Sequence, residues 1–173
     1  MASLMEDFID TLNKEDEEYQ KLLLISRRKT PIIVKGDTEN LAKITEEEQV
    51  VVDKINNLDK HREEILNDIA TVLNRDVQEL KIPRIVELLK GQTKEQEQLQ
   101  DVYNRLKVTT SDMKAVNEEN SRLIKLSLEM VQFDMTLLQS MKQGPETGAY
   151  NSQGGYNDSG MIRGAVSRFD SKR

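Results

Sequence analysis

The stretch over residues 93–141 constrains the fold of this chain more than any other feature, because it has the pattern of one uninterrupted helix. It opens with Thr93 followed three residues later by Gln96, a capping-box pattern typical of a helix start. At a rise of 1.5 Å per residue the helix spans about 70 Å. A compact domain of 173 residues does not need a helix of that length. The sequence therefore predicts an elongated all-α protein.

Apolar residues recur at every third or fourth position of this stretch and share one face of the helix. We expect this face to be buried against other helices along its whole length. The residues predicted to be buried are Leu99, Val102, Leu106, Met113, Ile124, Leu128, Val131, Met135 and Leu138.

The last third of the stretch carries a second apolar row on the roughly opposite side of the helix. One helix of a small bundle cannot bury two opposite faces, so this row needs a second copy or another protein to cover it. An uncovered apolar patch is typical of an interaction surface. The predicted protein-binding residues are Leu126, Met130, Phe133, Leu137 and Met141, with Leu123 at the edge.

Three more helices are predicted before position 93. The first covers 3–29 and stops before Thr30, because Pro31 disfavours a helical conformation of the residue before it. Asp37 is a good N-cap for a second helix over 38–73, and a short helix follows over 83–90. Short loops favour antiparallel neighbours. We expect an elongated antiparallel bundle, or helical hairpin, of three long helices and one short helix.

Polar residues interrupt the apolar faces of the two longest predicted helices. Glu48 and Arg62 either reach the edge of the helix contact or meet a charge on a facing helix, and the edge is the favoured interpretation because long side chains readily extend to water. Thr110, Asn117 and Asn120 weaken the apolar face of the last helix. Buried asparagines in such positions more often fix the register of packed helices than bind ligands, and at the edge of the helix contact they are simply solvated.

The composition changes abruptly after position 142. Six of the eight glycines lie in residues 143–173, and such a segment buries too little apolar surface to order itself. We expect a helical domain over 1–142 and a flexible tail over 143–173 that contains Tyr150 and Tyr156. Apolar residues in such a tail are as often incidental as they are docking motifs.

Charge and rare residues argue against several classes of function. The net charge of −6 is unfavourable for binding nucleic acid or an anionic membrane, and the chain has no cysteine for a thiol nucleophile or a zinc site. The single histidine, His61, lies between Lys60 and Arg62 with no nucleophile paired to it. No apolar run reaches the length of a membrane span, and the N-terminus does not resemble a signal peptide. We expect a soluble intracellular protein with no enzymatic activity, metal or cofactor.

The chain resembles the FlgN family of flagellar type III export chaperones. The resemblance rests on EDEEYQKLLLISRRKTPIIVKGDTENLAKITEEEQVVVDKINNLDKHREEIL over 15–66, NSRLIKLSLEMVQFDMTLL over 120–138 and GAYNSQGG over 148–155. It covers nearly the whole chain.

This resemblance implies a cytoplasmic chaperone, without ATPase activity, for the hook-associated proteins that join the flagellar hook to the filament. Such a chaperone binds a terminal helical segment of its substrate, prevents premature assembly, and presents the substrate to the export gate and its associated ATPase. The substrate-binding region maps onto residues 120–138, and Tyr150 is the counterpart of a gate-docking tyrosine, although the tail also holds Tyr156.

Two other functions remain open from the sequence. One is a homo-oligomeric structural coiled coil, in which the second apolar row is buried against another copy. The other is a flagellar chaperone for a filament or cap protein. The free protein is expected to be a monomer or a weak dimer.

Overall fold

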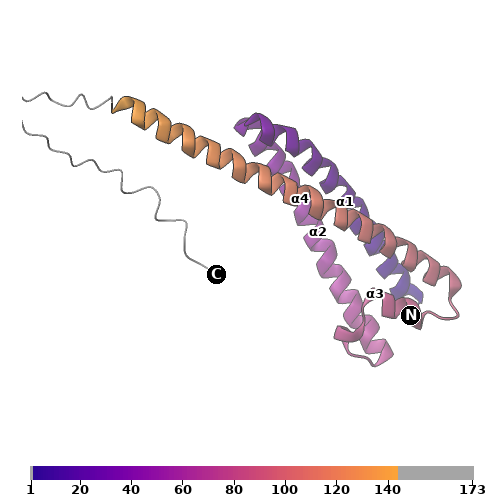
Figure 1. The fold of residues 1–173 in the computed structure, drawn as a ribbon. Coiled ribbons are helices and arrows are strands. Elements are labelled where there is room, and N and C mark those ends of the chain that lie inside the picture. The colour runs from indigo at the N-terminus through magenta and orange to yellow at the C-terminus, as the bar shows by residue number, and fades with distance from the viewer. Residues whose placement is uncertain (1, 144–173) are drawn as a thin grey trace, which may run out of the picture. The chain divides into compact units, whose positions relative to one another are not determined.

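The computed structural model describes residues 2–143, which form four α-helices and one short 3₁₀ helix. The all-α prediction is therefore confirmed for this part of the chain. The chain divides into two units, residues 1–134 and residues 135–173, and the buried core belongs to the first unit. The elements in chain order are α1 (Ala2–Lys35), α2 (Thr38–Leu73), η1 (Val77–Glu79), α3 (Ile82–Leu88) and α4 (Thr93–Lys142), and Figure 1 labels the four α-helices.

Helix α1 is longer than predicted and contains a proline. The expected end at position 29 is wrong, because α1 continues through Pro31 to Lys35. A proline inside a helix costs about 3 kcal/mol, since it removes a backbone hydrogen bond and crowds the preceding turn. Tertiary contacts on both sides offset this cost. The Thr30 hydroxyl donates a hydrogen bond to Asn120 Oδ1 on α4 at 2.6 Å, and Ile33 is buried.

A tight turn joins α1 to α2. Gly36 adopts a left-handed conformation with φ of 66°, which glycine tolerates without strain. Asp37 then caps α2, because its carboxylate accepts a hydrogen bond from the backbone N–H of Asn40. The same hydrogen bond lowers the pKa of Asp37, since it favours the charged carboxylate. The predicted bounds of α2, 38–73, are confirmed.

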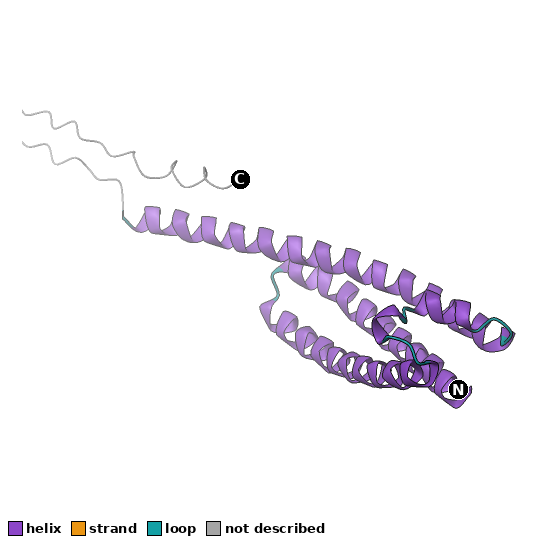
Figure 2. Cartoon of the chain, turned by 90° about the horizontal axis from the view of Figure 1, so that it is seen from below, coloured by secondary structure: helices purple, strands orange, loops and turns teal. Residues whose placement is uncertain are grey.

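Helices α1 and α2 lie side by side and antiparallel (Figure 2). Glu15 of α1 accepts a hydrogen bond from Arg62 Nε at 2.9 Å, and Lys29 of α1 pairs with Glu48 at 2.6 Å. Residue numbers therefore rise along α1 as they fall along α2. The favoured interpretation of Glu48 and Arg62 as edge residues is wrong, because both meet an opposite charge on α1.

A cluster of buried apolar residues lies at the end of the bundle where η1 and α3 pack, and other buried apolar residues such as Ile33, Ile44 and Val51 lie outside it. The predicted short helix over 83–90 corresponds to α3, with Pro83 in its first turn. Leu80, Ile85 and Leu89 come from this segment and are almost completely buried. This cluster contains Met5, Phe8, Ile9, Leu12, Ile65, Ile69, Ala70, Leu80, Ile85, Leu89, Leu99, Val102 and Leu106.

Helix α4 runs parallel to α1. The Thr109 hydroxyl donates to Asp16 at 3.0 Å, and the Asn120 side-chain amide donates to the backbone carbonyl of Ser26 at 2.9 Å. Partners in these two bonds are 93 and 94 positions apart, which places the end of α1 level with about position 128 of α4. The predicted helix over 93–141 agrees with α4 to within one residue.

Candidate functional site

The residues predicted to bind a partner protein lie on the last third of α4, and most are exposed. We call Leu126, Met130, Phe133, Leu137 and Met141 the second row. Their exposed fractions range from 46% for Leu126 to 71% for Met141, and Phe133 is 68% exposed. Leu123, at the edge of the row, is partly buried. Large apolar side chains that gather on one exposed helix are a feature of interaction surfaces.

The other apolar face of this part of α4 is also exposed, which contradicts the prediction that it is core. We call Ile124, Leu128, Val131, Met135 and Leu138 the core-facing row, because it continues the face that packs in the bundle. Ile124 is partly buried, whereas Leu128, Val131, Met135 and Leu138 are 54–59% exposed. The last buried residue of α4 is Asn120.

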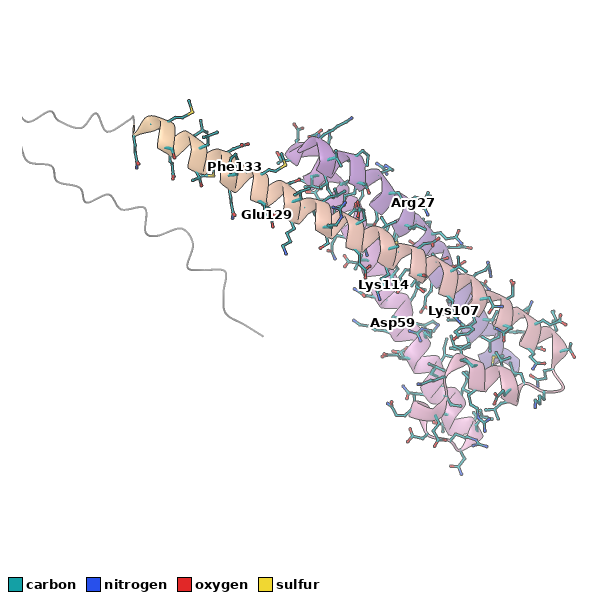
Figure 3. All side chains as sticks on the ribbon, in the orientation of Figure 1. Arg27, Asp59, Lys107, Lys114, Glu129 and Phe133 are labelled. Atoms are coloured by element: carbon teal, nitrogen blue, oxygen red, sulfur yellow. The ribbon has the colours of Figure 1, made fainter. Side chains whose placement is uncertain are left out.

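The physical reason for this difference is the unequal length of the helices. Helix α1 has 34 residues and α2 has 36, whereas α4 has 50. Since Lys35 at the end of α1 is level with about position 128 of α4, residues of the first unit beyond that point have no facing helix in α1. Figure 3 shows Glu129 and Phe133 on this uncovered stretch, with their side chains directed away from the helix.

The two apolar rows lie on different sides of α4. Successive residues of an α-helix are turned by about 100°, which puts the centres of the two rows about 140° apart. Ser127 and Asp134 lie in the narrower gap between them. The wider gap is polar, and the side chains there are Arg122, Lys125, Glu129, Gln132, Thr136, Gln139 and Ser140.

A buried polar contact lies at the start of the exposed region. Asn120 is only 5% exposed, donates to the Ser26 carbonyl and accepts from the Thr30 hydroxyl. This arrangement matches the prediction that asparagine fixes helix register. The related prediction that Thr110 and Asn117 lie on the packed face is wrong, since both are exposed.

Electrostatic features of this region are those of a helix surface. Glu119 accepts two hydrogen bonds from Arg122, at 2.9 and 2.7 Å, and this pairing lowers the pKa of Glu119 and raises that of Arg122. His61 lies outside the region, half exposed on α2, with Nε2 at 3.5 Å from an Asp7 oxygen. Within residues 2–143, no three histidine or carboxylate side chains are grouped closely enough to hold a metal ion.

Sequence reasoning missed the exposure of the core-facing row, although a usable signal was present. The predicted lengths of the first two helices are much shorter than that of the last, so part of the last helix had to lie beyond them. Tyr150 and Tyr156, the two tyrosines predicted to contact an export gate, lie outside the described residues.

The family model described as FlgN protein matches residues 1–158 of this chain. The chain belongs to the FlgN family. FlgN proteins are flagellar export chaperones, so membership of the family gives this chain the general role of a flagellar export chaperone. Comparison with curated proteins and with solved structures gives no match. None of the helices described combines the length and apolar character needed to cross a bilayer.

Proposed function

We propose that this FlgN protein binds a terminal helical segment of flagellar hook-associated proteins in the cytoplasm and delivers them to the type III export gate. The observation that carries the proposal is the second row of α4, a line of exposed apolar side chains on a helix of a chaperone family. A partner helix with apolar residues at matching spacing would cover this row.

The chemistry of the second row suits this task. Met130 and Met141 are flexible side chains that adapt to different apolar partners. Phe133 supplies the largest apolar surface, and complete burial of such a side chain contributes about 1.5–3 kcal/mol. Several such side chains together give enough energy to hold a substrate segment, and covering them also keeps the substrate segment from other contacts.

Delivery to the gate and its associated ATPase is the second part of the proposal. It is supported by membership of a family of export chaperones. Tyr150, with Tyr156 as the alternative, is the residue that we propose contacts the gate. No role in catalysis is proposed for any residue.

The test is a double substitution in the second row, Phe133→Asp with Leu137→Asp. We expect the affinity for a synthetic peptide of the hook-associated protein's terminal helix to fall at least 100-fold by calorimetry, because two charges would have to be buried in the contact. Both side chains are at least half exposed, so helix content measured by circular dichroism should not change.

The matched control is Gln132→Asp with Thr136→Asp, which adds the same two charges at the same spacing on the polar side of α4. This control should bind the peptide as the parent protein does. Unchanged affinity of the Phe133 and Leu137 variant would reject the second row as the binding surface. Preferential binding of a filament or cap protein would instead reassign the substrate. A stable dimer that buries the second row would favour the structural coiled coil.

A further inference from the structure

The end of α4 has two exposed apolar rows, whereas one docked helix needs only one. The apolar contact stripe of a surface helix is somewhat wider than 100°. The centres of the two rows are about 140° apart on α4. A single partner helix on the second row would therefore leave Leu128 and Val131 of the core-facing row in water.

The core-facing row continues an interface that already exists in the bundle. The side of α4 that carries Val102, Leu106 and Met113 packs against α1 and α2, and Val131 lies on the same side about five turns beyond Met113. A helix placed on this row would lie where α1 would lie if it did not end at Lys35. The core-facing row therefore resembles the packed surface of a helix whose partner helix is missing.

A second copy of this chain would not cover both apolar rows. Its own α4 offers one helix, which would bury one row of each copy and leave the other row of each copy exposed. Two helices from one partner chain bury both rows at once. Because they are joined, binding of the first helix raises the effective concentration of the second.

The gap between the rows adds a chemical requirement. Asp134 is exposed there, and none of the ion pairs found within residues 2–143 involves it. Two helices that lie on the rows would face each other across this carboxylate. A lysine or arginine on one of them would pair with Asp134 as the contact loses water.

We infer that the substrate segment held by α4 is a pair of helices from one chain, one on the core-facing row and one on the second row, with a basic residue near Asp134. This inference rests on the proposed chaperone function and specifies the form of its substrate.

Three consecutive residues of α4 allow a crosslinking test in which the probes differ in the side of the helix that carries them. Val131 lies on the core-facing row, Gln132 on the polar side and Phe133 on the second row, each turned by about 100° from the one before. The chain contains no cysteine, so Val131→Cys, Gln132→Cys and Phe133→Cys each accept a single photo-crosslinker. Each labelled protein is mixed with the full-length hook-associated protein, irradiated, and the adducts are mapped by mass spectrometry.

We expect the probes at Val131 and Phe133 to label two separate segments of the substrate, and the probe at Gln132 to give at least fivefold less adduct. Labelling of one and the same segment from both positions would overturn the inference. Labelling of a second copy of the chaperone from Val131 would also overturn it.

If the bulky crosslinker prevents docking, the two-helix inference is tested instead by measuring the affinity of aspartate variants for the same substrate. Val131→Asp and Phe133→Asp should each weaken binding at least tenfold, and Gln132→Asp should not. If only Phe133→Asp weakens binding, the two-helix inference is wrong and the proposed function stands. If neither Val131→Asp nor Phe133→Asp weakens it, the proposed function is wrong as well.

Discussion

The two parts of α4 on either side of Asn120 have similar apolar residues and different surroundings. Before Asn120, the apolar side chains on one face of α4 are buried in the bundle, and Leu99 and Val102 of this face are completely buried. After it, within the first unit, Leu128 and Phe133 are more than half exposed. The two parts belong to one continuous helix.

This difference teaches that the periodicity of a helix shows which faces are apolar, and the length of its neighbours decides which of those faces become core. Leu99 and Leu128 are the same residue type on the same side of α4. They differ because the first faces α1 and α2 and the second lies level with the end of α1. An apolar face that no neighbouring helix covers is then available to bind a partner.

Truncation of these two leucines tests the comparison directly. Leu99→Ala should lower the free energy of unfolding by about 2–5 kcal/mol, because it leaves a cavity among buried side chains. Leu128→Ala should change it by less than about 0.5 kcal/mol, as at other exposed positions. Urea unfolding followed by circular dichroism measures both. Equal losses would mean that the region of Leu128 is packed in solution, and the comparison would fail.

The asparagine at the boundary gives a second test. Asn120→Ala removes two buried hydrogen bonds, one to the Ser26 carbonyl and one from the Thr30 hydroxyl, and at about 0.5–1.5 kcal/mol each this costs about 1–3 kcal/mol. Asn117→Ala, one turn earlier and exposed, should cost less than about 0.5 kcal/mol. The same urea titration compares them. A loss at Asn117 as large as that at Asn120 would show that the hydrogen bonds of Asn120 do not hold α4 in register.

Much of the local structure could be predicted from the sequence. Asp37 before a regular apolar spacing gave the start of α2, and the uninterrupted spacing after position 93 gave the bounds of α4. These signals are local, because a cap and an apolar period depend on neighbouring residues.

Two features could not be predicted because they depend on residues distant in sequence, and a third was missed although the predicted helix lengths indicated it. Pro31 stays inside α1 since Thr30 and Ile33 are held by tertiary contacts. Arg62 meets Glu15 because α1 places that carboxylate opposite it, 47 positions away. The core-facing row is exposed because α1 ends early, which the periodicity of α4 does not show but a comparison of the predicted helix lengths does.

The contrast between covered and uncovered regions extends to charge. Glu15 is only 5% exposed, in the α1–α2 contact, whereas Glu129 of α4 is exposed. Burial raises the pKa of Glu15 above its ordinary value of 4.5, although the attraction of Arg62 opposes this rise. The charged form of Glu15 is therefore less favourable in the folded chain than in the unfolded chain.

The sign of the pH effect follows from this direction. A carboxyl group with a raised folded pKa contributes stability that is fully present below 4.5 and is lost as pH rises through the folded pKa. Relative to Glu15→Gln, the parent protein should lose free energy of unfolding as pH rises from below 4.5 towards neutrality. Urea titrations at several pH values measure the difference, and a parent protein that instead gains stability relative to Glu15→Gln would show that Arg62 outweighs burial at this position.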